Sequence, residues 1–289
     1  MEKENKTKAL IYILVCIGLW ALIPVVSRLG QQSLDNYQFL FWSSLLSFFA
    51  LAASCLVTKK FKNFKNYTGH NLWSALGLGF LGCFLYYLLL YFGYARARGL
   101  EVLVIQYTWP IFIVLFSIIF LKEKIKNQNI IAIILGFLVV LLVLTKGEFN
   151  QIYLGNLAVD LVVLLAALVF GLFSVLSKKI NLEPYSATTI FFISATIFSF
   201  FSMIIFSHFV FPAKNSWLLI LVNGIFINGF SYVLWLKGLS YAKTSFIAPL
   251  LFLTPILAAV LIVIFFHEAL LPVYFLGLIL VLTAGLISK

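Results

Sequence analysis

The sequence contains the stretch GYARARGLEVLVIQYTWPIFIVLFSIIFLKE at residues 93–123 and a similar one, GLSYAKTSFIAPLLFLTPILAAVLIVIFFHE, at residues 238–268. Both carry a glycine, an alanine, a basic residue, a proline and a glutamate in the same order. The pairs are Gly93 and Gly238, Ala97 and Ala242, Arg98 and Lys243, Pro110 and Pro255, and Glu123 and Glu268. The same offset pairs Gly79 with Gly224 and Tyr87 with Tyr232. The chain therefore contains two copies of one apolar unit.

The composition places this unit in a lipid bilayer. Hydrophobic residues make up 63% of the chain and charged residues 10%, and the mean hydropathy is +1.11, which excludes a soluble globular protein. A helix needs roughly 20 apolar residues to cross the hydrocarbon core. Apolar stretches of this length predict an all-α polytopic membrane protein with ten transmembrane helices, at residues 9–28, 37–57, 72–94, 100–121, 127–145, 153–177, 186–208, 216–237, 244–266 and 270–288.

The basic residues predict the orientation of these spans. With the N-terminus inside, 15 of the 20 Lys and Arg residues fall in inner segments, as the positive-inside rule expects. We therefore expect a multi-pass protein of the inner cell membrane with both termini cytoplasmic. Because the positive charge follows the topology, we expect no nucleic-acid partner. Five spans are an odd number of crossings, so residues 1–148 and 149–289 are predicted to be five-helix repeats of opposite orientation.

Inverted repeats are typical of secondary transporters, because two similar halves of opposite orientation can exchange conformations around a midplane site. A weaker similarity at an offset of 150 places Trp20–Leu29 over Phe170–Lys179 and extends the repeat to the first span of each half. An enzyme is the rival class. The three histidines are scattered, and no metal-ligand spacing, catalytic triad or phosphate-binding loop is present. We expect no enzymatic activity, no metal and no cofactor.

Two features resemble a known family. The Pro-containing span followed by an acidic residue, at Pro110 with Glu123 and at Pro255 with Glu268, resembles the ten-span EamA type of the drug/metabolite transporter superfamily. The core Tyr107-Thr108-Trp109-Pro110 also resembles the fourth span of that family's aromatic amino-acid exporter branch. The first resemblance covers essentially the whole chain, and the second covers this one span.

The chain departs from the family pattern in its second span. Many members carry an arginine there after an aromatic pair, whereas this chain has Phe41, Trp42 and Ser43. This absence weakens the inference that a substrate carboxylate is bound at this position, so a substrate that is neutral, cationic or held in a different way stays open.

Polar and aromatic residues near the predicted midplane are the candidate substrate-binding residues. Pro110 and Pro255 each remove a backbone donor in mid-span, which predicts either a hinge or a static kink. An aromatic wall beside an amide suits a small amphipathic solute, although core packing explains the same residue types. The candidates are Trp20, Tyr87, Gln106, Tyr107, Trp109, Asn228, Tyr232 and Thr254. Asn223, five residues before Asn228, is interpreted as a helix-packing residue.

The acidic residues have competing interpretations. Asp160 falls inside a predicted span, which makes it a candidate for proton coupling, yet it also suits the first turn of a wetted helix. Glu101 follows Arg98 by three residues, which predicts a local ion pair. Glu123 and Glu268 are either gating residues or architectural helix ends.

Together these patterns predict a secondary transporter of small organic metabolites working by alternating access. The resemblance implies amino-acid export, aromatic or broadly hydrophobic. The alternatives are import of another small metabolite, and a lipid or polyisoprenoid flippase. The expected partners are a small-molecule substrate and the lipid bilayer, and ten spans can close a cavity within a monomer.

Overall fold

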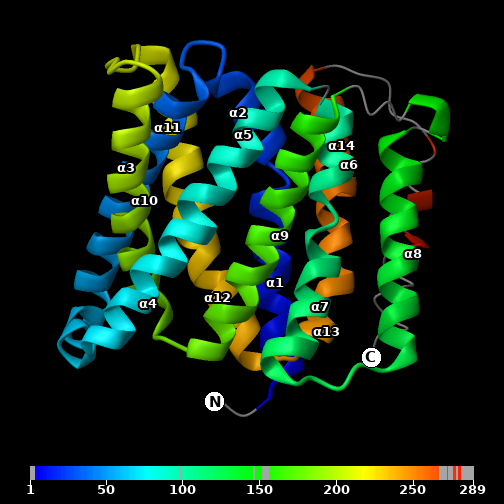
Figure 1. Ribbon diagram of the computed structural model, residues 1–289, viewed down its shortest axis with the longest axis horizontal. Coiled ribbons are helices and arrows are strands. Elements are labelled where there is room, and N and C mark those ends of the chain that lie inside the picture. The colour runs from blue at the N-terminus through cyan, green and yellow to red at the C-terminus, as the bar shows by residue number, and fades with distance from the viewer. Residues whose placement is uncertain are drawn as a thin grey trace.

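The computed structural model describes residues 4–97, 99–145, 147–151 and 156–266, together with residues 272, 276, 277, 279 and 280. Every regular element among them is helical (Figure 1). The α-helices are α1 (Lys6–Trp20), α2 (Ile23–Gly30), α3 (Asn36–Val57), α4 (Gly69–Gly79), α5 (Tyr86–Arg96), α6 (Gly99–Gln106), α7 (Trp109–Leu121), α8 (Asn127–Leu144), α9 (Leu157–Ile180), α10 (Pro184–Phe206), α11 (Trp217–Leu221), α12 (Ser231–Tyr241), α13 (Thr244–Ile247) and α14 (Leu253–Phe266). The 3₁₀ segments are η1 (Lys60–Asn66), η3 (Phe149–Gln151), η4 (Lys214–Ser216) and η6 (Ala248–Phe252). The π-helical segments are η2 (Phe80–Leu85) and η5 (Val222–Phe230).

The described helices confirm an all-α polytopic membrane protein. Eight of them, counted with their short internal breaks, are long and apolar enough to cross a membrane. They match eight of the ten predicted spans, and the shorter apolar helix α8 matches the fifth. The tenth predicted span falls almost entirely outside the described residues. Large apolar side chains are exposed on the outer faces of α3, α7, α8 and α10, as contact with lipid requires.

Side-chain caps fix where several helices begin. Asp35 and Gln38 form a reciprocal capping box at the start of α3, and Asn156 accepts the Val159 N–H at the start of α9. Each cap satisfies backbone N–H groups that have no partner within the helix. These short polar residues also mark the ends of the apolar stretches in the sequence.

Two spans at equivalent positions of the repeat contain a π-helical segment. The third span changes from α4 to η2 and α5, and the eighth changes from α11 to η5 and α12. A π-helical turn widens the helix and is often found at functional sites. Because both copies of the repeat contain a π-helical segment, this segment is a feature of the repeated unit.

Glycines next to these segments allow neighbouring helices to approach closely. A Cβ built on Gly79 would lie 2.5 Å from the Phe191 backbone of α10, and one built on Gly224 would lie 2.8 Å from the Ser43 carbonyl oxygen of α3. Gly82 is similarly close to the Phe173 ring. Neighbouring helices therefore approach closely at Gly79 and Gly82. At Gly77, in the same span, an added Cβ would meet nothing within 4 Å.

Three other spans, the first, the fourth and the ninth, are also interrupted. The first span is interrupted between α1 and α2, immediately before Pro24. The fourth is interrupted between α6 and α7, where Pro110 is in the first turn of α7. In the ninth span, the 3₁₀ segment η6 leads into α14, which includes Pro255. Proline cannot donate the helical hydrogen bond, so these interruptions follow from the sequence. In Figure 1, α9 runs through the middle of the molecule between α5 and α7.

Candidate substrate cavity

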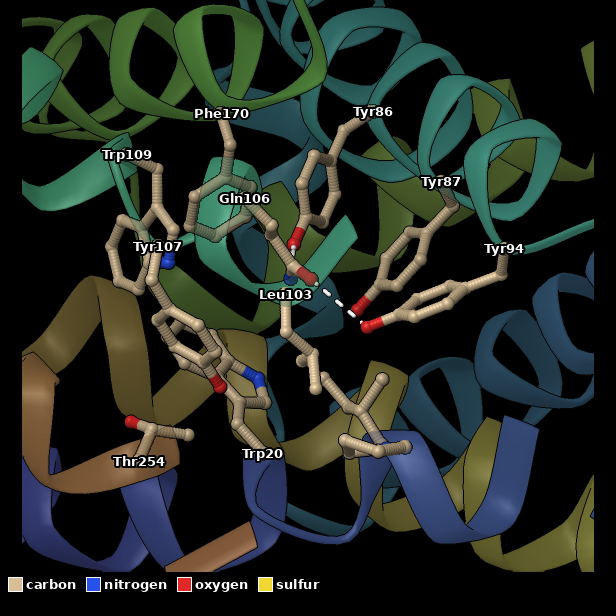
Figure 2. A pocket seen from close by; sticks show the side chains of 12 residues that line it. Trp20, Tyr86, Tyr87, Tyr94, Leu103, Gln106, Tyr107, Trp109, Phe170 and Thr254 are labelled. Carbon is tan, nitrogen blue, oxygen red and sulfur yellow. Dashed lines mark hydrogen bonds between the residues drawn. The ribbon is translucent and has the colours of Figure 1, made fainter. Parts of the chain in front are cut away.

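The interrupted spans surround a small cavity in the middle of the bundle (Figure 2). Its volume is about 20 Å³, little more than the space one water molecule needs. A metabolite therefore fits only after the lining side chains move apart. The cavity is lined by Trp20, Ile23, Pro24, Tyr86, Tyr87, Tyr94, Leu103, Gln106, Tyr107, Trp109, Phe170 and Thr254.

Aromatic rings from both halves form one wall of the cavity. The Trp109 ring packs edge-on against Phe170 with centroids 5.0 Å apart, and Trp20 lies 5.7 Å from Phe170 and 5.9 Å from Trp109. Trp20 and Phe170 occupy equivalent positions in the repeat, so the two copies meet here. The Trp20 indole N–H donates to the Ser231 hydroxyl at 2.8 Å, which holds its ring in place.

Gln106 is the fixed polar group of this cavity. Its Nε2 donates to the Tyr86 hydroxyl at 2.8 Å, and its Oε1 accepts from the Tyr94 hydroxyl at 3.1 Å (Figure 2). Both ends of the amide are thereby oriented. An amide has two N–H donors and two oxygen lone pairs, so one of each stays available for a ligand.

Thr254 contributes a second polar group from the opposite half of the chain. Its side chain is buried, and its hydroxyl has no hydrogen-bond partner among the described residues. Leaving a buried hydroxyl unpaired costs about 1–3 kcal/mol. A hydroxyl left unpaired at a cavity wall is suited to bind a polar group of a solute.

The structure brings together six of the eight predicted substrate-binding residues. Trp20, Tyr87, Gln106, Tyr107, Trp109 and Thr254 all line the cavity. Tyr232 and Asn228 do not. The Tyr232 hydroxyl donates instead to the Gly82 carbonyl oxygen of η2 at 2.9 Å, and Tyr232 packs beside the aromatic wall.

Asn228 and Asn223 are both buried in η5, away from the cavity. Asn228 has neither amide atom hydrogen-bonded among the described residues. Its neighbour Asn223 donates to the Ser43 hydroxyl at 2.9 Å and so links η5 to α3, as expected of a helix-packing residue. Because η5 is π-helical, ordinary helical periodicity could not predict which way these amides face.

Six of the twelve cavity residues were not predicted from the sequence, and three of these six are aromatic. Tyr86, Tyr94 and Phe170 line the cavity with the predicted set. Aromatic residues make up 17% of the chain, so another tyrosine or phenylalanine is not distinctive. For Phe170 the available signal was its equivalence to Trp20 in the repeat.

Glu123 links two helices at the lysine-rich end of the bundle, defined here as the end that carries Lys60, Lys124, Lys178 and Lys237. Its Oε1 accepts from Lys178 Nζ of α9 at 3.0 Å. Its Oε2 accepts from the Thr244 hydroxyl at 2.7 Å and from the Thr244 backbone N–H at 3.1 Å, at the start of α13. Lys178 also donates to the Ala242 carbonyl oxygen at 2.6 Å. We call Glu123, Lys178 and Thr244 the latch.

The latch determines the ionisation of Glu123. Burial by itself would raise the pKa of this carboxyl group, but the Lys178 charge and the hydrogen bonds from Thr244 and Lys178 offset burial and lower the pKa below its usual range. Glu123 is therefore a carboxylate at neutral pH. Glu268, the repeat equivalent of Glu123, lies outside the described residues.

Asp160 is in the first turn of α9 and is 6% exposed. Neither carboxyl oxygen accepts a hydrogen bond from a donor among the described residues. The Glu101 side chain, near the start of α6 and also 6% exposed, lies close to Asp160. Arg98, the expected partner of Glu101, lies outside the described residues. Asp160 is ten residues before Phe170, about 15 Å along the helix from the cavity.

Comparison with known proteins identifies relatives of the whole chain. The sequence profile of the EamA-like transporter family matches residues 7–145 and again residues 157–288. An uncharacterized transporter of Bacillus subtilis, YxxF, is 24% identical over 268 residues, which cover 92% of this chain and 84% of that protein. The aromatic amino acid exporter YddG of Ancylobacter novellus is 25% identical over 197 residues, 66% of this chain and 67% of that protein.

A solved crystal structure has the same fold. It superimposes with a TM-score of 0.82, covering 99% of this chain and 98% of the other chain, at 17% sequence identity. At this identity the similarity concerns the fold alone.

Proposed function

Because the chain belongs to the EamA-like transporter family, we propose that it moves a small amphipathic metabolite through the cavity around Gln106 and Trp109, and that it exports aromatic or other hydrophobic amino acids. The main support for this proposal is the set of side chains that line the cavity. Aromatic rings from both halves face an oriented amide and an unpaired threonine hydroxyl. Rings provide contact area for an apolar side chain, while the polar groups orient its amino-acid end.

Alternating access supplies the mechanism. We treat residues 1–148 and 149–289 as inverted five-helix repeats, with both termini cytoplasmic in the inner cell membrane. The breaks at Pro110 and Pro255 act as hinges on either side of the cavity. The latch closes the lysine-rich end, and its release opens the cavity to the cytoplasm. Glu268, the repeat equivalent of Glu123, is the gating candidate of the second half.

Asp160 is the proposed proton-coupling residue. Its carboxyl group is buried in the first turn of α9, and neither oxygen has a hydrogen-bond partner among the described residues. Carboxyl groups inside a membrane are costly, which makes this one a candidate for carrying a proton. Asp160→Asn should retain substrate exchange but lose acceleration by a pH gradient, whereas Glu148→Gln, at an exposed position, should behave like wild type. Unchanged gradient dependence in Asp160→Asn would remove Asp160 from the coupling mechanism.

Counterflow into proteoliposomes tests the substrate class. Vesicles containing the purified protein are loaded with unlabelled amino acids, nucleotides or lipophilic cations, and uptake of the labelled form is followed. We expect saturable exchange of phenylalanine, tyrosine or tryptophan. Exchange restricted to another class would redirect the assignment to import or export of that metabolite, and lipid scrambling without solute exchange would favour the flippase alternative.

A further inference from the structure

A second and larger cavity lies at the lysine-rich end, between the end of α9, the start of α10 and the end of α12. Its volume is about 390 Å³, which is within the usual range for small-ligand sites. Three lysines line it, Lys60, Lys178 and Lys237, together with the hydroxyl groups of Ser177 and Tyr185. It shares no lining residue with the cavity around Gln106.

Lys237 supplies positive charge that the protein does not neutralise locally. Its ammonium group lies 3.4 Å from the Tyr185 hydroxyl and over the rings of Tyr185 and Tyr12, at 4.6 and 5.5 Å from their centroids. These contacts position the ammonium group, and none of them involves an acidic side chain. Within the described part of the chain, Lys237 forms no ion pair.

Two other charged side chains of this cavity, those of Lys178 and Glu183, have partners. Lys178 is paired with Glu123 in the latch. Glu183, the acidic lining residue, accepts from the Ser186 backbone N–H at 2.9 Å and from the Ser186 hydroxyl at 2.8 Å, so its carboxylate caps α10. These hydrogen bonds orient the Glu183 carboxylate without cancelling its charge. Lys60 is exposed at the margin. With Lys178 paired to Glu123, Lys60 and Lys237 outnumber the single carboxylate of Glu183 among the lining residues, so the net charge of the lining is positive.

Ser177 provides an independent indication of a ligand. The side chain is 6% exposed, lines the cavity, and its hydroxyl has no hydrogen-bond partner among the described residues. Ser174, one turn earlier on α9, shows the contrast, because its hydroxyl donates to the Phe170 carbonyl oxygen and accepts from the Trp235 indole N–H. An unpaired buried donor beside the Lys237 ammonium group suits an oxyanion.

We propose that this cavity is an oxyanion-binding site in which the Lys237 ammonium and the Ser177 hydroxyl hold a carboxylate or phosphate group, with Lys60 at its entrance. The ligand is either a free anion, such as the carboxylate of a metabolite, or the phosphate of an anionic lipid headgroup. Because a lysine-rich end is expected to face the cytoplasm, the ligand comes from that side. Binding here does not depend on the identity of the transported substrate.

Protection of Lys237 from acetylation tests the proposal without a transport assay. The full chain is reconstituted in phosphatidylcholine nanodiscs and treated briefly with an amine-acetylating reagent, and modified lysines are quantified by mass spectrometry. Inorganic phosphate and acetate are compared with sodium chloride at equal ionic strength. The exposed Lys124 is the internal reference. A parallel sample contains phosphatidylglycerol in the nanodisc. We expect acetylation of Lys237, relative to Lys124, to fall at least about threefold.

The added anions and the two nanodisc compositions distinguish the two sources of the oxyanion. Protection by phosphate or acetate in phosphatidylcholine identifies a free anion, and protection only with phosphatidylglycerol identifies a lipid headgroup. Ser177→Ala should reduce the protection, whereas Ser54→Ala, whose hydroxyl bonds within α3, should not. No protection under any condition, or full protection in Ser177→Ala, would overturn the proposal. Loss of amino-acid counterflow with Lys237 protection intact would instead contradict only the transport assignment.

Discussion

Glu123 and Lys178 form an ion pair with an oxygen–nitrogen distance of 3.0 Å, although they are 55 residues apart and belong to different copies of the repeat. Both side chains are 9% exposed, so the pair is largely shielded from solvent. The same carboxylate caps α13 through Thr244. One acidic side chain therefore joins the end of the fourth span to the sixth and ninth spans.

Breaking this ion pair should destabilise the closed lysine-rich end. Glu123→Gln and Lys178→Met should each lower the free energy of unfolding by about 3 kcal/mol, because each leaves a poorly solvated partner. The double variant should lose much less than the sum of the two. Thermal unfolding of the purified protein measures this double-mutant cycle. Lys179→Met, at the exposed neighbouring position, is the control. Additive losses would contradict the pairing.

The lowered pKa of Glu123 predicts the pH dependence of this stabilisation. A carboxyl group whose pKa is lower in the folded state stabilises the protein above its ordinary pKa, and the stabilisation disappears as the pH falls through the lowered value. The difference in melting temperature between wild type and Glu123→Gln should thus be constant above about pH 5.5 and shrink below the ordinary value of 4.5. A difference already shrinking at pH 6.5 would be inconsistent with a lowered pKa.

Thr254→Val should separate binding from packing. Valine has nearly the shape of threonine, and the Thr254 hydroxyl is unpaired, so the melting temperature should stay the same or rise slightly. If the hydroxyl binds substrate, KM for the amino acid should increase about tenfold, which corresponds to losing one hydrogen bond of roughly 1.4 kcal/mol. Thr188→Val is the matched control, because Thr188 is equally buried and lies outside the cavity. Unchanged KM in Thr254→Val would assign Thr254 to packing.

Gly79→Ala should weaken the contact between α4 and α10. The added methyl group would lie 2.5 Å from the Phe191 backbone, which cannot move like a flexible side chain. Overpacking of this kind costs about 1–3 kcal/mol. Gly77→Ala, two residues earlier and facing open space, should be neutral or mildly stabilising. Thermal unfolding of the two variants compares them directly, and equal stability would show that the helices are not in tight contact at Gly79.

The sequence predicts the number and order of the described spans well, because a bilayer requires about 20 apolar residues whatever the neighbouring helices are. It does not predict the π-helical segments η2 and η5, which depend on packing between helices. The region around Gln106 and Trp109 was predictable because an amide and an indole are unusual at mid-span. The role of Lys178 was not, since its partner Glu123 is brought near only by the packing of α7 against α9.

Whether the aromatic cavity carries the substrate is tested by counterflow of labelled phenylalanine with the Trp109→Ala variant. Trp73→Ala, at a side chain 74% exposed, is the matched control. Gel filtration and circular dichroism verify that each variant is folded before reconstitution. We expect saturable exchange by wild type and Trp73→Ala and none by folded Trp109→Ala. Normal exchange by Trp109→Ala would contradict substrate binding in this cavity.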